Sequence, residues 1–274
     1  MWKKIPSRFH AVDMHNHLWT GPQPGLADPA AVERLLHAAD LLGIERIGIS
    51  NPITAETVTA EEIKLANDVT LDAMNQSRRF FGFVFVDPRD PETAVAEIDR
   101  CAKLGMAGVK LYHQLLVCDE AQRPVMEAAA QWGIPVLMHA GLVTDPDTIS
   151  RQPRLSHAGH FLKALDMFPD TTLIQAHIGG GGDWEWNLRV LDGIKSDRYF
   201  IDLGGSVCDA NIVRRTIDAV GASRVLFATD MSMEEGVAKL DAAKLDEPEL
   251  EKILSGNWRR IEARRKSSAK EQAQ

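Results

Sequence analysis

The chain has 274 residues, a formal net charge of −8 and a hydrophobic fraction of 45%. This length suits one large α/β domain, and the negative charge argues against a general nucleic-acid binder, whose affinity depends on clustered Lys and Arg. No apolar run approaches the roughly 18 residues that span a membrane, and the three cysteines form no C-x-x-C pair. We therefore expect a soluble, cytoplasmic protein with a small-molecule substrate and no nucleic-acid or membrane partner.

Eight short segments rich in aliphatic and β-branched residues recur along the chain. Most are apolar at consecutive positions, which is typical of parallel strands that are covered on both faces. We interpret each as a strand: residues 9–17, 46–50, 80–87, 107–113, 134–140, 172–178, 199–205 and 224–230.

Helix-like segments lie between these strands. Asp28 followed by Pro29 predicts a helix over residues 29–43, with Asp28 as N-cap, proline at the first helical position and Gly43 as terminator. Asp90 followed by Pro91 predicts a second helix of the same kind. The chain therefore alternates strands and helices from its start.

A repeat of strand and helix at intervals of about 30 residues, eight times over, is the pattern of a (β/α)₈ TIM barrel. We predict such a single α/β barrel over residues 1–262, with an open doubly wound sheet as the competing architecture. Residues 263–274 lack an apolar stripe, and we predict that they form a disordered C-terminal tail.

Ionisable residues gather at the carboxyl ends of the predicted strands, where a barrel builds its active site. Asp13, His15 and His17 alternate on one strand and therefore share a face, so the two imidazoles can converge on one metal ion. In a closed barrel the eighth strand lies beside the first, which brings Asp230 to the same ion. The complete set of candidate site residues is His15, His17, Lys110, His139, His177 and Asp230.

A single histidine on an apolar strand is more often a hydrogen-bonded core residue than a ligand. Four histidines at strand ends, together with an acid at the eighth, favour a site. We interpret the other five as structural or surface residues: His10, His37, His113, His157 and His160.

Six motifs in order along residues 9–261 carry a family resemblance: DMHNH, GVKLYH, PVLMHAG, LIQAHIGGG, VLFATDMS and ILSGNWRRI. The chain resembles the amidohydrolase superfamily, specifically the amidohydrolase-related branch of TIM-barrel metal-dependent hydrolases. That branch includes lactonases and decarboxylases of the aminocarboxymuconate semialdehyde type. The resemblance also implies a homodimer.

The resemblance implies a divalent ion, usually zinc, held by His15, His17 and Asp230, with His139 as a further ligand. His177 would be either a ligand of a second ion or a free base beside the first. In binuclear relatives a lysine of the fourth strand is carboxylated and bridges two ions, and Lys110 stands where that lysine would. An unmodified Lys110 could instead pair with a substrate carboxylate.

We expect a hydrolase in which metal-activated water cleaves an ester, lactone or amide bond of a small substrate. Asp230 would move the proton and His177 would act as ligand or base. Asp13 would either hold a metal-bound imidazole through its second nitrogen or be a buried acid paired elsewhere in the floor of the barrel. The alternative is a non-oxidative decarboxylase with the same metal shell. Two further readings are a barrel whose metal is structural or whose role is partner binding, and a TatD-like nuclease. The lack of a glutamate on the fourth strand disfavours the nuclease.

Three segments are expected to surround the site. The glycines at 179–182 form either an anion-binding nest or a flexible loop. Trp19, Trp184 and Trp186 either wall a pocket or pack between helices. The loop 142–158 is expected to act as a lid, whose two arginines, Arg151 and Arg154, either bind an anionic substrate or face solvent.

Overall fold

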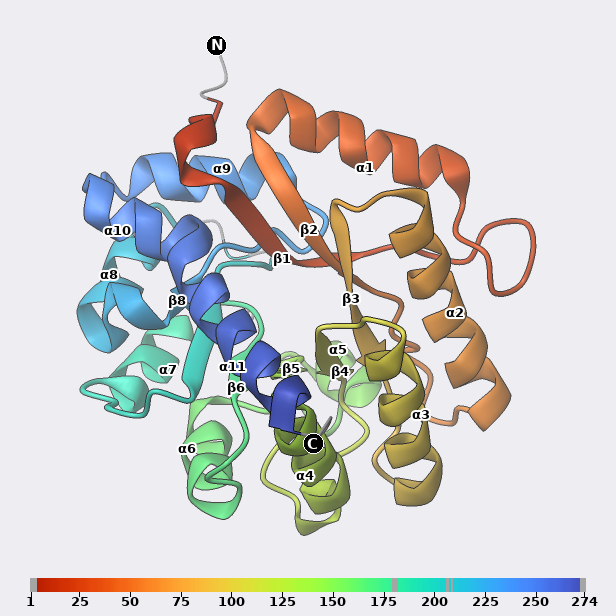
Figure 1. The fold of residues 1–274 in the computed structure, drawn as a ribbon. Coiled ribbons are helices and arrows are strands. Elements are labelled where there is room, and N and C mark those ends of the chain that lie inside the picture. Colours follow the sequence, from red (N-terminus) through yellow and green to blue (C-terminus); the bar gives the residue numbers. More distant parts are fainter. Residues whose placement is uncertain (1–3, 179–181, 206, 208, 272–274) are drawn as a thin grey trace.

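The computed structural model describes residues 4–178, 182–205, 207 and 209–271, with side chains up to residue 265. Eight parallel strands in the described residues form one sheet whose spatial order is the order of the chain (Figure 1). They are β1 Ala11–His17, β2 Ile44–Ser50, β3 Phe80–Phe85, β4 Gly108–Leu111, β5 Val136–Met138, β6 Leu173–Gln175, β7 Tyr199–Asp202 and β8 Val225–Leu226.

The sheet closes because the segment around β8 bonds to β1. Met14 N donates to Phe227 O at 3.1 Å, and Asp230 N donates to His15 O at 2.8 Å. Sequential strand order with the last strand beside the first is the topology of a (β/α)₈ barrel, whereas a doubly wound sheet reverses its order midway. The predicted barrel is therefore confirmed.

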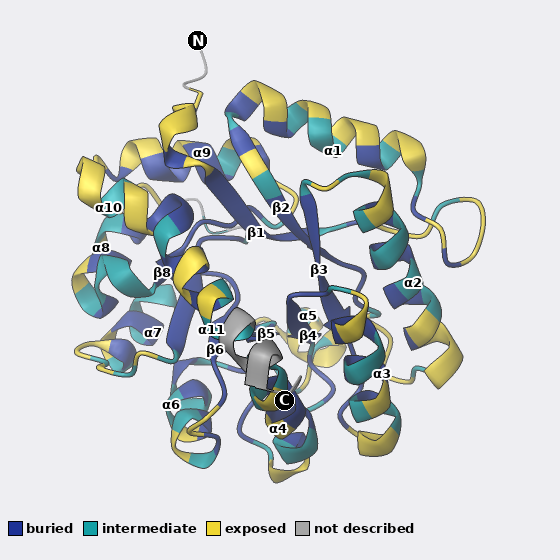
Figure 2. Ribbon diagram, in the orientation of Figure 1, coloured by how far each residue is buried: buried dark blue, intermediate teal, exposed yellow. Residues whose placement is uncertain are grey.

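Helices surround the strands and present their exposed faces outward (Figures 1 and 2). Asp28 caps the first helix by accepting from Ala30 N, and Gly43 ends it in the left-handed conformation, as predicted. The helices are α1 Pro29–Leu42, α2 Ala60–Gln76, α3 Pro91–Lys103, α4 Arg123–Trp132, α5 Pro146–Arg151, α6 Ala158–Met167, α7 Trp184–Leu191, α8 Ile212–Val220, α9 Met233–Ala242, α10 Glu247–Glu251 and α11 Asn257–Glu271.

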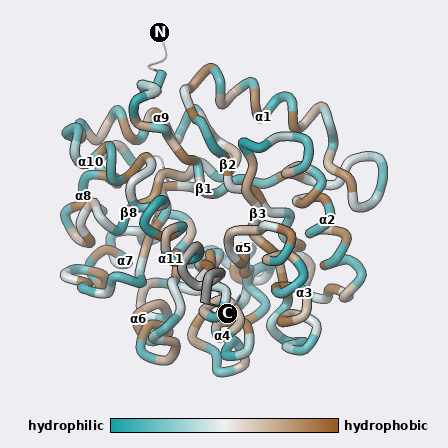
Figure 3. The backbone as a smooth tube through the Cα atoms, in the orientation of Figure 1, coloured by the Kyte–Doolittle hydropathy of each residue, from teal (hydrophilic) through white to brown (hydrophobic). Residues whose placement is uncertain are grey.

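The interior of the barrel is apolar toward the amino ends of the strands. Trp258, from the start of α11, stacks on Phe81 of β3 with ring centroids 4.7 Å apart, and Phe83 lies 5.8 Å from the same indole. The hydropathy colouring shows apolar segments along the strands and polar ones on the outer helices (Figure 3). This packing fills one end of the barrel and leaves the carboxyl ends of the strands for polar groups.

The chain after residue 262 continues as helix, since α11 extends to Glu271. Arg264 donates to Thr172 Oγ1 at 3.1 Å and to Asp197 Oδ2 at 2.8 Å. The first positions of the predicted tail are thus helical, while the division at residue 262 stays a prediction. Among the described helices, none combines the length and the apolar character needed to cross a membrane.

Candidate functional site

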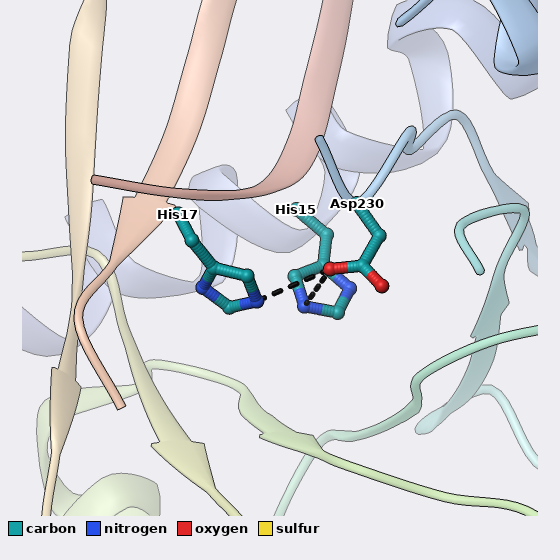
Figure 4. A group of neighbouring side chains, drawn as sticks. All are labelled: His15, His17 and Asp230. Carbon is teal, nitrogen blue, oxygen red and sulfur yellow. Dashed lines mark ion pairs between the residues drawn. The ribbon is translucent and has the colours of Figure 1, made fainter. Parts of the chain in front are cut away.

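Two imidazoles and a carboxylate meet where β1 and β8 end (Figure 4). His17 Nε2 lies 3.1 Å from Asp230 Oδ1, and His15 Nε2 lies 3.7 Å from the same oxygen. The potential ligand atoms of these three residues lie within 4.8 Å of one another. The predicted meeting of the first and eighth strands is thus seen in the geometry.

Outer partners determine which nitrogen of each imidazole faces Asp230. His15 Nδ1 donates to Asp202 Oδ2 at 2.9 Å, and both side chains are fully buried. His17 Nδ1 donates to the backbone oxygen of Ser50 at 3.2 Å. Because Nδ1 carries the proton in each ring, the Nε2 lone pairs point toward Asp230.

Asp13 is buried in this region, but its carboxylate bonds to Thr229 and Asn16 and not to an imidazole. Its Oδ1 accepts from Thr229 N at 3.0 Å and its Oδ2 accepts from Asn16 Nδ2 at 2.5 Å. Burial raises the pKa of Asp13 to about 7, although these hydrogen bonds oppose the rise. The expectation that Asp13 orients an imidazole is therefore wrong, and Asp202 has that position. The pairing of β1 with β2 shifts register between Asp13 and Asn16, which breaks the alternation assumed from the sequence.

Asp230 is positioned by its backbone as well as by its side chain. Its φ is 46°, in the left-handed region, and the next residue, Met231, has a φ of 72° and donates its N–H to Asn16 Oδ1 at 3.0 Å. Such backbone strain in non-glycine residues persists where the surroundings hold it, commonly at functional sites. The turn after β8 therefore aims the carboxylate back at β1.

The site at neutral pH combines an ionised acid with neutral imidazoles. Burial opposes ionisation of Asp230, but protons carried by the neighbouring imidazoles of His15, His17 and His177 would outweigh it, and they hold the pKa of this carboxyl well below its usual range. Burial lowers the pKa of His17 to about 4 and that of His177 to about 4. Neutral imidazole nitrogens and a carboxylate are the donors that divalent transition metals bind.

His139 and His177 form the opposite wall. His177 Nε2 and His139 Nδ1 lie 2.8 Å apart, and His139 Nε2 lies 3.0 Å from Gln152 Oε1. An amide oxygen only accepts, so His139 donates from Nε2, accepts at Nδ1, and leaves Nδ1 of His177 without a proton. The ring of Tyr112 stacks on His139 at a centroid distance of 4.1 Å.

This chain of hydrogen bonds leaves Nδ1 of His177 as an acceptor without a donor, and such an atom shows whether the site fits a metal ion. His177 Nδ1 is buried without a hydrogen-bond partner, and it lies 3.5 Å from Asp230 Oδ2, which is also an acceptor. Two acceptors that face each other need a cation or a proton between them. Lone pairs of His15, His17 and His177 thus surround the Asp230 carboxylate, so these residues fit a divalent ion.

Lys110 of β4 lies in the same centre. Its Nζ is 2.8 Å from His15 Nε2, and its side chain is fully buried. Burial lowers the pKa of Lys110 to about 8, while the carboxylates of Asp230 and Asp202 act in the opposite direction. The structure therefore brings all six predicted residues to one end of the barrel, with His139 outside the group that surrounds Asp230.

A cavity of about 470 Å³ opens beside these residues. It extends from His139, His177 and Asp230 to the segment 142–158, in which α5 forms part of the wall. Its described lining is His139, Ala140, Val143, Thr144, Asp145, Thr148, Gln152, Leu155, His177, Gly182, Gly205, Asp230 and Ser232.

The arginines of segment 142–158 are not in this lining. Arg154 donates to the backbone oxygen of Gln114 at 2.6 Å and pairs with Glu56, and Arg151 donates to Asp147 O at 3.3 Å. The glycines at 179–181 lie outside the described residues.

Some of the aromatic residues and remaining histidines lie at the site, whereas others make structural contacts elsewhere in the barrel. The ring of Trp19 stacks on that of His17, with centroids 5.6 Å apart. The ring of Trp186 instead meets that of His157 edge to face, with centroids 5.1 Å apart. His113 bonds to the backbone oxygen of Thr54 at 3.2 Å, as a structural histidine would.

The sequence analysis missed two residues that shape the site. Asp202 ends β7, so the rule that selected the other strand ends would have found it. Gln152 follows a six-residue helix in a loop and carries no signal in the sequence.

A family model described as amidohydrolase matches residues 12–261, nearly the whole barrel. The chain belongs to the amidohydrolase family. The predicted resemblance is thereby confirmed, and the chain is an enzyme of the amidohydrolase-related superfamily.

The individual proteins that this chain resembles share only a small part of its sequence. The γ-resorcylate decarboxylase of Polaromonas sp. (strain JS666 / ATCC BAA-500) is 23% identical over 257 residues, which cover 74% of this chain and 77% of the relative. A dihydroxybenzoic acid decarboxylase from Polaromonas sp. JS666, solved with manganese and the inhibitor 2-nitroresorcinol, is 19% identical with a TM-score of 0.71, covering 92% and 96% of the two chains. The 5-carboxyvanillate decarboxylase from Sphingomonas paucimobilis is 20% identical with a TM-score of 0.70, covering 92% and 98%. At these identities the solved structures establish the shared fold.

These comparisons contradict the prediction of a hydrolase. Decarboxylases predominate among the named relatives, which favours the alternative reading of the sequence. The physical reason is that the six motifs report the groups that surround an ion, and the same groups serve cleavage of a carbon–carbon bond as well as attack by water.

Proposed function

We propose that the enzyme is a metal-dependent, non-oxidative decarboxylase of a hydroxylated aromatic acid. The observation that carries this proposal is the ionised Asp230 among the lone pairs of His15, His17 and His177, beside a cavity large enough for a single substituted ring. The named relatives support it, since two of them act on dihydroxybenzoates by their names.

A divalent ion would be held by His15, His17 and Asp230, with His139 or His177 as a further ligand. It would supply a positive centre that binds and polarises the carboxylate and a neighbouring oxygen of the substrate. Manganese, bound in the relative from Polaromonas, and zinc, expected from the sequence, are both candidates.

The reaction requires a proton on the ring carbon that loses carbon dioxide. His177 and Asp230 both line the cavity, with Nδ1 and Oδ2 3.5 Å apart. We assign to this pair the relay of a proton from solvent: His177 Nδ1, which carries no proton in the free site, takes one up beside the Asp230 carboxylate and passes it to the ring carbon as the bond to the carboxylate breaks. The electron pair of that bond stays on the ring and takes the proton, so the acid becomes a phenol and carbon dioxide leaves.

The decisive experiment incubates the metal-loaded enzyme with 2,6-dihydroxybenzoate in ²H₂O and, separately, in H₂¹⁸O. We expect carbon dioxide and resorcinol with one deuterium at the former carboxyl position and no ¹⁸O in the resorcinol. Loss of activity with a chelator and its return with Mn²⁺ or Zn²⁺ would support the metal. Cleavage of esters, lactones or amides, without release of carbon dioxide from any hydroxybenzoate, would refute the proposal.

The number of ions depends on Lys110. A carboxylated Lys110 would bridge two ions, whereas the free amine, 2.8 Å from His15 Nε2, is placed to meet a substrate carboxylate instead. Metal analysis of the purified protein and of Lys110→Met separates the two. A fall from two ions per chain to one indicates the bridge, and one ion in both proteins indicates the free amine.

A further inference from the structure

The cavity beside the proposed metal centre is lined by acidic and neutral side chains. Its described lining contains two carboxylates, Asp145 and Asp230, and no lysine or arginine. The other polar groups that face it beyond the histidines are neutral, namely Thr144, Thr148, Gln152 and Ser232. A ligand in this space would therefore meet positive charge only at the end where an ion is held.

Cationic side chains on the segments around the cavity are engaged elsewhere, including Lys239, which donates to the backbone oxygen of Gly205 at 2.6 Å, and the exposed Arg151, which donates to Asp147 O. Arg154 is bound to Glu56 and to the Gln114 backbone, and Arg89 is bound to Asp87 through three hydrogen bonds of 2.7 to 3.1 Å. Lys110 is fully buried against His15 and faces the metal-binding residues. One carboxylate at that end can therefore be matched by the ion and Lys110 together.

A second carboxylate elsewhere on the ring would lie against neutral side chains and the Asp145 carboxylate, with no cation in the described lining to pair with it. Moving a carboxylate from water into a site that offers no cation costs far more than moving a hydroxyl, which threonine and glutamine side chains satisfy by hydrogen bonds. The Asp145 carboxylate would add repulsion.

We propose that this enzyme selects aromatic acids with a single carboxylate, and that the ring substituents distant from the ion are neutral hydroxyl groups held by Thr148, Gln152 and their neighbours. The inference rests on the proposed function and narrows it. Dihydroxybenzoates fit this class, whereas dicarboxylated phenols, such as the substrate named for the 5-carboxyvanillate decarboxylase, do not.

A matched pair of acids tests the inference. 2,4-Dihydroxybenzoate and 2-hydroxyterephthalate differ only at position 4, opposite the reacting carboxylate, where one has a hydroxyl and the other a second carboxylate. Binding of each to the Mn²⁺-loaded enzyme is measured by calorimetry, and carbon dioxide release is measured in parallel. We expect the dihydroxy acid to bind at least 100-fold more tightly.

The outcomes separate this inference from the function on which it rests. Equal or tighter binding of the dicarboxylate, with release of carbon dioxide, overturns the charge selection and leaves the decarboxylase intact. Absence of binding and turnover with both acids, and with 2,6-dihydroxybenzoate, overturns both.

A charge added to the cavity wall provides a second test. Thr148 lies on α5 in the lining and contacts none of the proposed metal ligands, so Thr148→Lys adds a cation and Thr148→Gln is the neutral control of similar length. We expect the lysine variant to reduce the preference for the monocarboxylate by at least tenfold relative to the glutamine variant. The same preference in both variants would show that lining charge does not set selectivity.

Discussion

The two walls of the site are built in different ways. On the β1–β8 wall, His15 is held by the fully buried Asp202, and Asp230 is bonded through its backbone to β1. On the opposite wall, His139 is held by Gln152, next to the short helix α5, in which no residue is buried. The comparison indicates that the proposed ion would be held by the barrel itself, whereas the opposite side of the site depends on a surface segment.

Removal of the carboxylate from the β1–β8 wall should have the largest effect. We expect Asp230→Asn to lower metal affinity by more than about 100-fold and to abolish carbon dioxide release, because the carboxylate that faces Nε2 of His15, Nε2 of His17 and Nδ1 of His177 is lost. Equilibrium dialysis measures the affinity. Asp145→Asn, which removes the other carboxylate of the lining, is the control and should retain the metal.

Both walls contain buried neutral imidazoles, so the metal-free protein should lose stability in acid. His17 and His177 have pKa values of about 4 when folded, against 6.5 when unfolded, so the unfolded chain binds more protons below pH 6.5. The free energy of unfolding should fall by roughly 3 kcal/mol per histidine between pH 7 and pH 4.

Urea titrations at several pH values measure this loss of stability. The pH dependence should be shallower in His177→Asn, which cannot take up the proton. An unchanged slope in that variant would contradict the assignment of His177 as a buried neutral group.

Asp202→Asn tests the orientation of His15. An amide cannot accept as a carboxylate does, and its NH₂ group would favour the wrong tautomer of the imidazole, so we expect metal affinity to fall about 10- to 100-fold. Ser50→Ala is the comparison: it removes the neutral hydroxyl 3.1 Å from His17 Nδ1 but keeps the backbone oxygen at 3.2 Å, so the loss of metal affinity should be smaller. Equal losses in the two variants would mean that these partners do not act through imidazole orientation.

Replacement of Gln152 should have the smallest effect of these changes, and it should lower kcat more than metal affinity. We expect Gln152→Leu to lower kcat roughly tenfold, with metal affinity reduced less than in Asp202→Asn, since Gln152 acts on the opposite wall through His139. Gln152→Glu keeps an acceptor for His139 Nε2 and should restore much of the rate, with a shifted pH profile. Ile149→Ala, at an exposed position of α5 outside the cavity lining, controls for damage to α5, and failure of the glutamate variant to exceed the leucine variant would contradict the positioning role.

Local patterns predicted much of this molecule. The N-cap at Asp28 and the terminator at Gly43 act within a few residues, so the sequence shows them directly. The positions of His15, His17 and Asp230 followed from a barrel rule, namely that strand ends gather on one face. Asp202 obeys the same rule and was overlooked, whereas Asp13 was misassigned because a register shift in β1 has no clear sequence signal.

By itself, the sequence determined the barrel and the residues that converge at its open end, because strand periodicity, caps and chain order are properties of neighbouring residues. Only the tertiary structure decided which partner orients each imidazole, since Asp202 and Gln152 reach His15 and His139 across strands and loops distant in the chain. It also decided the charge of the cavity wall, because Arg154, from the segment that lines the cavity, is paired with Glu56 of a distant segment. Hydrogen bonding and charge pairing act through space, and the fold sets those distances.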